Sequence, residues 1–269
     1  ESSMAEQRKA LVRLDHIHKT FNPGSVSQMG VFQDFSFEIM EGGFISVVGS
    51  NGSGKTTMLN LICGSIPVDE GRIFLRETDI TKMPEYRRAT HIGRVFQDPA
   101  KGTCPSLTIL ENLSLADNKG KGYGLGLGVT KKREEFYKQQ LSLLHLGLED
   151  KVNLPVGALS GGQRQALALL ISTLTPIDLL VLDEHTAALD PKSSENVMEL
   201  TDRIVREKQV TAIMVTHNLR FAVEYGNRLV MMDKGHCVVD SGHDPKEKRQ
   251  YQIEDLLKVF NEISVECGN

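Results

Sequence analysis

The sequence predicts an α/β fold with a mainly parallel sheet, an antiparallel β part near the N-terminus and an inserted helical subdomain. Three observations predict it. After residue 161, helical segments alternate with apolar strand segments, as in a parallel sheet covered on both faces. Residues 11–48 form apolar runs broken by turn residues, which is typical of strands. The middle, about 99–160, has helical spacing instead.

The composition is that of a folded globular protein. The chain has 269 residues, 40% hydrophobic and 25% charged, which is enough to bury a sizeable core. Lys and Arg number 31 against 35 Asp and Glu, and the net charge of -4 argues against a dedicated nucleic-acid-binding protein. No apolar run approaches the ~18 residues of a membrane span. Four scattered cysteines without a CxxC pair favour a reducing compartment.

The N-terminal third is expected to form strands around one helix. A helix is expected over 56–63, and Gly64 is expected to end it. Strands are expected at 11–14, 35–39, 44–48, 71–75 and 92–96. This order puts the antiparallel β part and the first strands of the core within residues 11–98.

Helices at 108–116 and 131–146 are expected in the middle of the chain, and alternating glycines at 118–128 predict a mobile loop between them. The elements expected after it are a helix at 161–174, a strand at 179–182, a helix at 193–206, a strand at 211–215, a hairpin of 228–232 with 237–239, and an amphipathic tail helix at 253–263 that caps the core.

The domain limits follow from this order of elements. We expect one domain over 4–245, with a core made of 11–98 and 158–245. The helical subdomain is expected at about 99–157, and a C-terminal helix in 246–269.

A phosphate-binding loop lies between the strand at 44–48 and the helix at 56–63. Its residues match GxxxxGK[ST]: Gly49, Ser50, Asn51, Gly52, Ser53, Gly54, Lys55 and Thr56. The glycines let backbone N–H groups wrap an anion, and the helix start adds its positive dipole end. Lys55 adds charge near the β- and γ-phosphates, Thr56 offers a hard oxygen to Mg²⁺, and Thr57 can bond another phosphate. The loop predicts a P-loop NTPase core.

Two acids, Asp183 and Glu184, follow the apolar strand at 179–182. The carboxyl end of a parallel strand faces the ligand crevice of such a sheet. Asp183 can hold Mg²⁺ there through water, and Glu184 can polarise the attacking water. The alternative is a strand that merely ends at a solvated turn, which the P-loop upstream disfavours.

A second helix start with bare backbone lies at 159–163. Ser160 is a natural N-cap, and Gly161 and Gly162 open a segment of strong helix formers. This predicts an anion-binding helix start distinct from the P-loop. One ATP cannot easily need both from one chain, so we expect the helix start of one subunit to face the P-loop of another.

The segment at 159–163 resembles the signature motif of the ABC ATPases, the nucleotide-binding subunits of ABC transporters. The resemblance covers about 11–245, and its parts stand in the order typical of the family. Further matches are Gln97 at the Q-loop glutamine, Glu184 at the catalytic glutamate of Walker B, Asp190 in the D-loop, His217 at the switch histidine and Phe21 where an aromatic ring usually stacks on adenine.

The resemblance implies a role for each matching residue. Lys55, Glu184 and His217 are the implied catalytic residues. Thr56, Gln97 and Asp183 are the implied Mg²⁺ ligands. ATP would also contact the P-loop, Thr57 and Phe21, and the residues implied to bind the ATP of the partner in trans are Ser160, Gly161, Gly162, Gln163 and Asp190.

Three positions depart from the family pattern. Phe21 replaces the more common Tyr and keeps the stacking face without the hydroxyl, and Phe32 is a weaker candidate for the same role. His185 stands where proline usually follows the catalytic glutamate. It is expected to be a turn residue with a solvated ring, the alternative being a titratable group beside Glu184. Ala187 replaces a frequent serine, which would remove one contact across the dimer.

The resemblance implies an ATP- and Mg²⁺-dependent hydrolase that works as a head-to-tail dimer. It would energise import of a small solute, amino acids being the first candidates, through separate permease subunits and with an extracellular solute-binding protein. It would bind no nucleic acid and lie peripherally on the cytoplasmic face of the membrane. A non-transport ABC-type ATPase acting on ribosomes or DNA remains the alternative, although such chains usually carry two ATPase domains or a long coiled coil. The signature motif argues against a third class, a soluble small-molecule kinase.

Overall fold

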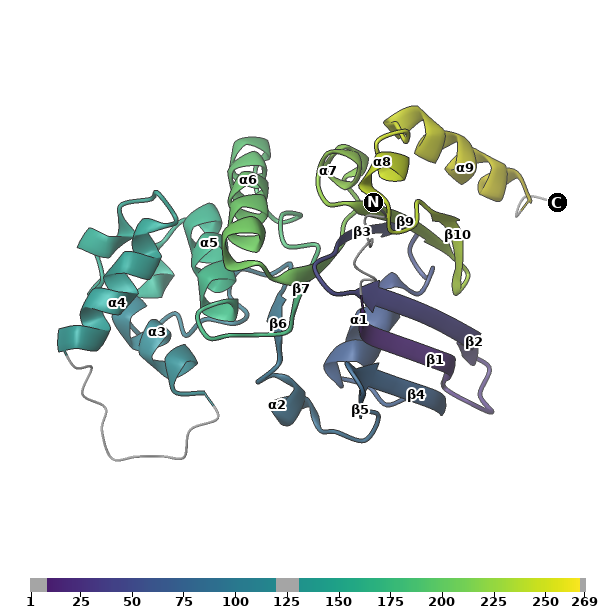
Figure 1. Ribbon diagram of the computed structural model, residues 1–269, viewed down its shortest axis with the longest axis horizontal. Coiled ribbons are helices and arrows are strands. Elements are labelled where there is room, and N and C mark those ends of the chain that lie inside the picture. The colour runs from purple at the N-terminus through teal and green to yellow at the C-terminus, as the bar shows by residue number, and fades with distance from the viewer. Residues whose placement is uncertain (1–8, 120–130, 267–269) are drawn as a thin grey trace, which may run out of the picture. The chain divides into compact units, whose positions relative to one another are not determined.

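The computed structural model describes residues 9–119 and 131–266 and divides the chain into two compact units (Figure 1). The first unit combines Glu1–Met83 with Thr211–Asn269, and the second is Pro84–Val210. The division falls elsewhere than the expected subdomain limits of 99 and 157, which therefore stay a prediction. Most of the glycine-rich loop predicted at 118–128 lies outside the described residues.

The first unit contains the predicted antiparallel sheet, in the order β2-β1-β4-β5. Its strands are β1 (Ala10–Phe21), β2 (Met29–Met40), β4 (Glu70–Leu75) and β5 (Thr78–Asp79). Leu14 of β1 pairs with Phe37 on one side and Ile73 on the other, so the apolar positions of three strands share one face. β1 extends beyond the predicted 11–14. Register shifts after Leu14 interrupt the alternation of apolar and polar side chains, so the sequence pattern did not reveal the rest of the strand.

Three parallel strands and one antiparallel strand, β10, form the other strand set of the first unit, in the order β10-β9-β3-β8. They are β3 (Phe44–Gly49), β8 (Thr211–Val215), β9 (Arg228–Asp233) and β10 (His236–Asp240). β3 pairs in parallel with β8 and β9, and β3 and β8 are buried throughout. Buried strands of this kind read as continuous apolar runs, which is why the sequence predicted them well. The β9–β10 hairpin is confirmed.

Helices of the first unit are α1 (Lys55–Cys63), α7 (Leu219–Glu224), α8 (Pro245–Lys248) and α9 (Ile253–Glu266). Gly64 ends α1 in the left-handed conformation, as predicted. The tail helix α9 buries Leu256 in a cluster with Val48, Leu229 and Met231, which confirms it as a cap on the core. Sequence patterns missed α7 and α8 because helices of four to six residues show too little periodicity.

The second unit packs helices around two parallel strands. β6 (Ile92–Val95) pairs with β7 (Leu179–Asp183), from Ile92 opposite Leu179 to Val95 opposite Leu182. Its helices are α2 (Glu85–Arg88), α3 (Ile109–Asp117), α4 (Lys131–Ser142), η1 (Leu148–Asp150), η2 (Val156–Ala158), α5 (Gly161–Ser172) and α6 (Pro191–Lys208). Together the two units confirm the α/β class. Within 9–119 and 131–266, no helix is both long and apolar enough to cross a bilayer.

Candidate functional site

The P-loop lies between β3 and α1, and its conformation requires glycine at two positions. Gly52 and Gly54 have φ of 78° and 104°, in the left-handed region that side chains disfavour. A Cβ on Gly54 would also lie 2.9 Å from the Phe32 ring, and one on Gly49 would lie 2.4 Å from the Met232 carbonyl oxygen. The loop therefore exposes backbone where an anion can approach.

Lys55 and Ser53 turn polar atoms toward the interior of this loop. The Lys55 ammonium is buried and donates to the carbonyl oxygens of Gly49 at 2.6 Å and Ser50 at 3.0 Å. The Ser53 hydroxyl is also buried, and no described residue forms a hydrogen bond with it. A buried hydroxyl without a partner is unfavourable, and a phosphate oxygen would satisfy it. Thr56, by contrast, is exposed.

The other predicted residues of the first unit are His217, Phe21 and Phe32. His217 is exposed directly after β8, in a turn held by Asn218, whose side chain accepts from the Phe221 N–H at 3.1 Å. Phe21 ends β1 half-buried, with the Lys19 ammonium 5.5 Å from its ring centroid. Phe32 is buried and stacks on Phe35 at 4.4 Å between centroids, so its ring belongs to the core and offers no face to adenine.

In the second unit, Asp183 and Glu184 stand at the end of β7 as predicted. An Asp183 carboxylate oxygen lies 2.9 Å from Nη2 of Arg94 on the paired strand β6. Glu184 is half-buried with φ of 50°, the left-handed conformation that costs a non-glycine residue about 1 kcal/mol or more. This conformation ends the strand abruptly. Gln97 follows the neighbouring strand β6 and is exposed.

The signature segment forms the predicted helix start, at α5. Ser160 Oγ accepts from the Gln163 N–H at 3.2 Å, and Gln163 Oε1 accepts from the Ser160 N–H at 3.0 Å. This reciprocal capping box fixes the first turn. Asp190 similarly caps α6, and its bonds to Ser193 hold the pKa of the Asp190 carboxyl below its usual value.

The prediction of a solvated ring at His185 is wrong. The His185 side chain is buried, and its Nε2 lies 2.9 Å from Thr201 Oγ1 of α6. Burial lowers the pKa of His185 to about 4, so the imidazole is neutral near pH 7. The turn after Glu184 directs the His185 side chain into the interior, and no feature of the sequence distinguished this from a side chain directed to solvent.

Sequence reasoning missed Gln165, which lies two residues after the signature and is fully buried. Its amide nitrogen donates to the carbonyl oxygens of Phe96 and His185 at 2.7 and 2.5 Å. The available signal was a polar residue inside the helical run of Ala and Leu. Glutamine is itself a good helix former, so its presence in the helical run did not indicate a special role.

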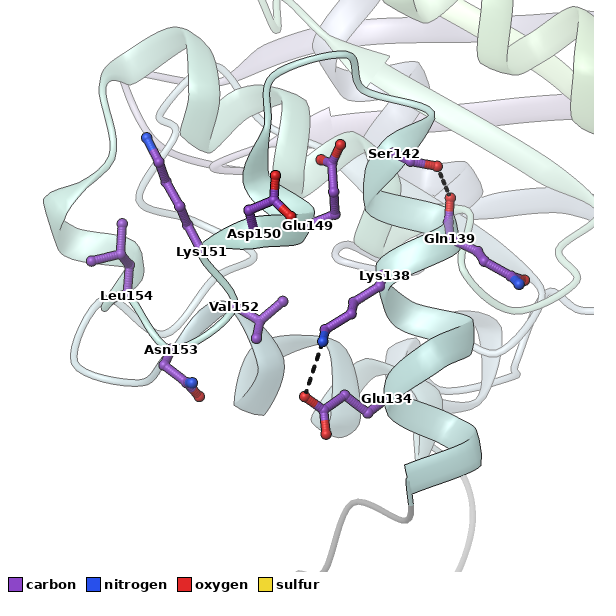
Figure 2. A pocket seen from close by; sticks show the side chains of 10 residues that line it. All are labelled: Glu134, Lys138, Gln139, Ser142, Glu149, Asp150, Lys151, Val152, Asn153 and Leu154. Atoms are coloured by element: carbon purple, nitrogen blue, oxygen red, sulfur yellow. Dashed lines mark hydrogen bonds and ion pairs between the residues drawn. The ribbon is translucent and has the colours of Figure 1, made fainter.

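A surface cavity of about 880 Å³ lies elsewhere in the second unit, between α4 and residues 149–154 (Figure 2). Figure 2 shows Lys138 of α4 reaching toward Glu134, with their charged atoms 3.6 Å apart. None of the residues predicted for ATP lines it. The residues predicted to bind ATP are divided between the two units. The P-loop, Phe21 and His217 belong to the first unit, and Gln97, Asp183, Glu184, the signature and Asp190 belong to the second.

A family model described as "ABC transporter" matches residues 32–187, more than half of the chain. The chain belongs to this family. The tyrosine transport ATP-binding protein of Clostridioides difficile is 46% identical over 250 residues, covering 93% of this chain and 98% of that protein. The phosphonates import ATP-binding protein PhnC of Lactococcus lactis is 28% identical, over 86% of this chain and 92% of its own length.

Two solved structures of ATP-binding cassettes are similar to this chain. A dimeric ATP-binding cassette in a post-hydrolysis state, bound to ADP and Pi, is 29% identical with a TM-score of 0.71, over 85% of this chain and 97% of its own. An ATP-binding cassette of an ABC transporter in its ADP conformation is 23% identical, with a TM-score of 0.75. The match covers 97% of this chain and 99% of that one and supports the fold. The chain is thus an ATP-binding and ATP-hydrolysing subunit of a transporter, and the ribosome, DNA and kinase alternatives are not favoured.

Proposed function

We propose that this ATPase energises import of an amino acid, with tyrosine as the first substrate to test, through separate permease subunits. The observation that carries the ATPase part is the P-loop, where a buried lysine and a buried hydroxyl without a described partner face the same backbone cradle. The solute is proposed from the 46% identity to a tyrosine transport ATP-binding protein. We further propose a peripheral position at the cytoplasmic face of the membrane and an extracellular solute-binding protein.

The proposed nucleotide site assigns different tasks to the two sets of residues. The Lys55 ammonium exchanges the Gly49 and Ser50 carbonyl oxygens for the β- and γ-phosphates of ATP. Phe21 stacks on adenine. Glu184 orients the attacking water and accepts its proton, and His217 contacts the γ-phosphate.

We also propose magnesium as the metal, on the chemistry of the predicted ligands. Mg²⁺ prefers hard oxygen ligands, and the exposed Thr56 hydroxyl, the Asp183 carboxylate and the Gln97 amide oxygen supply that chemistry. Bound there, the ion would neutralise charge on the β,γ-phosphates. Asp183 would then divide its oxygens between the ion and Arg94, its ion-pair partner at 2.9 Å.

The second helix start is proposed to act on the ATP of a partner chain. Ser160, Gly161, Gly162, Gln163 and Asp190 would close over the γ-phosphate in a head-to-tail dimer. Loss of that phosphate on hydrolysis would remove the bridge between the two chains. The dimer would loosen, which is how the reaction would move the permease.

Uptake of labelled tyrosine tests the proposal. Cells that lack the chromosomal copy receive the wild-type chain, Lys55→Ala or Lys258→Ala, the last changing an exposed lysine of α9. We expect wild-type and Lys258→Ala cells to accumulate tyrosine, Lys55→Ala cells not to, and membrane pull-downs to recover hydrophobic permease subunits. Equal accumulation in all three would refute tyrosine as the solute, and recovery of ribosomes or DNA in place of permease subunits would refute the transport role.

A further inference from the structure

Gln165 of α5 connects the backbone at the ends of both strands of the second unit. Its Nε2 lies 2.7 Å from the Phe96 carbonyl oxygen and 2.5 Å from that of His185. Both carbonyls can only accept, so the amide must present its two N–H groups to them, and this settles its orientation. Its Oε1 is buried and bonds to none of the residues in 9–119 and 131–266.

These two carbonyls stand next to residues of the proposed ATP site. The register of β6 and β7 ends at Val95 opposite Leu182, and beyond it no backbone pairing ties the two chain segments in the described residues. Phe96 directly precedes Gln97, and His185 directly follows Glu184. The Gln165 side chain thus bridges the two strands where their backbone pairing ends. The bridge lies between Gln97, the proposed Mg²⁺ ligand, and Glu184, the proposed base.

A further bond extends this connection to α6. Thr201 donates its hydroxyl hydrogen to the Val197 carbonyl at 2.7 Å, so its oxygen accepts from His185 Nε2 at 2.9 Å. The turn that carries Glu184 is therefore held at His185, whose backbone carbonyl bonds to α5 and whose ring bonds to α6. Both bonds are fully buried, where water does not compete with them.

Packing alone does not explain a glutamine at position 165. The next five residues of α5, 166–170, are buried Ala and Leu, and an apolar side chain would avoid leaving a buried oxygen without a partner. Polar groups kept under such conditions commonly hold a particular geometry. The geometry held here is the spacing between the Gln97 loop and the Glu184 turn.

We propose that Gln165 is a positioning residue for ATP hydrolysis, which holds Glu184 in register with the Gln97 loop and ties both to the helix that begins at Ser160. The proposal rests on the proposed function. ATP binding by the P-loop does not involve Gln165, so the residue should affect the rate of hydrolysis and leave the affinity for ATP unchanged.

Gln165→Met tests this, because methionine has the same length and flexibility but donates no hydrogen bond. In the full chain, we expect kcat to fall about 10- to 100-fold, the loss typical of a slightly misplaced catalytic group. The Kd of a fluorescent ATP analogue should stay within about twofold, because a group that acts only on the chemical step leaves ground-state binding unchanged. Gln165→Asn keeps the amide but is shorter by one carbon, so it should retain one bond and an intermediate kcat.

Thr173→Val is the matched control. Thr173 is a buried polar residue that caps the end of the same helix. Among the residues that the structure describes, its hydroxyl bonds to its own turn and to Lys208, away from both carbonyls. The kcat of Thr173→Val should equal that of the wild type, even if its Tm falls as far as the Tm of Gln165→Met. Wild-type kcat in Gln165→Met, or a kcat loss that follows Tm equally in both variants, would overturn the positioning role.

Two further results distinguish the positioning role of Gln165 from the proposed function. If Gln165→Met does not fold, Gln165→Asn alone decides, and a wild-type kcat in that variant overturns the role. If the wild-type chain shows no hydrolysis above Lys55→Ala, the proposed function fails first. Normal wild-type hydrolysis with unaffected Gln165 variants refutes the positioning residue alone.

Discussion

The two helix starts of the candidate site differ in how complete they are without a ligand. At the P-loop, α1 begins after Gly54 with no side chain capping it in the described chain, and the buried Ser53 hydroxyl has no described partner. At the signature, Ser160 and Gln163 cap α5 reciprocally. An anion at the P-loop would satisfy the Ser53 hydroxyl, whereas the two capping side chains of the signature already have their partners within the helix. This predicts that ATP binds first to the P-loop and that the signature joins only when a second chain meets it.

Lys55→Ala should have the largest effect on this comparison. Removing the ammonium removes charge-assisted contacts to two phosphates, and we expect ATP affinity to weaken by about 3 kcal/mol or more. Isothermal titration calorimetry with Mg-ATP measures it. Ser160→Arg serves as the counterpart in the other helix start and should leave ATP affinity of the isolated chain unchanged. Equal losses in both would mean that one chain uses both helix starts for the same ATP.

Acid should destabilise the second unit through His185. The unfolded state has the ordinary histidine pKa near 6.5, whereas the buried ring has a pKa of about 4. Between these values the unfolded state binds the extra proton, so stability present above pH 6.5 is lost as pH falls toward 4, by about 2 to 3 kcal/mol in total.

Denaturant unfolding at pH 7 and pH 4.5, without nucleotide or Mg²⁺, measures this loss. His185→Gln removes the titrating ring and keeps a group able to bond Thr201, so it should lose less stability than the wild type over the same interval. An identical loss in both proteins would show that His185 does not contribute to acid sensitivity.

Phe21→Ala should weaken ATP binding by about 1–3 kcal/mol, the amount that stacking of a base on an aromatic ring contributes. Phe136→Ala, which removes a half-buried ring from α4, is the control and should bind ATP normally. Unchanged affinity in Phe21→Ala would exclude this ring as the adenine platform. Phe32 would not replace it, because that ring is buried against Phe35.

The smallest effect is expected from Ser160→Ala. Loss of the cap should reduce the free energy of unfolding by about 1 kcal/mol, because the Gln163 N–H loses its acceptor. ATP affinity of the isolated chain should not change. Thermal unfolding and titration with ATP measure the two effects separately, and a weaker affinity for ATP would contradict a signature that is dispensable for the first binding step.

The sequence predicted the parts of this protein that depend on local chemistry. β3 and β8 are almost continuous apolar runs, Gly49 and Gly54 of the P-loop stand where a Cβ would clash, and Ser160 caps the helix it precedes. The features it missed depend on contacts far along the chain. His185 turns inward, where Thr201 accepts a hydrogen bond from its ring. Gln165 matters because the carbonyl groups of Phe96 and His185 lie within reach of its amide. A single sequence does not specify those neighbours.

In the proposed dimer, each ATP lies between the P-loop of one chain and the signature of another, and mixing two inactive variants tests this arrangement. Lys55→Ala lacks a working P-loop, and Ser160→Arg lacks a working signature. In the trans arrangement, a mixed dimer has one site with both lesions and one site with neither. Mixing should therefore restore ATPase activity above the sum of the two parents. Activity that stays at that sum, with mixed dimers verified by cross-linking, would contradict independent sites shared between two chains.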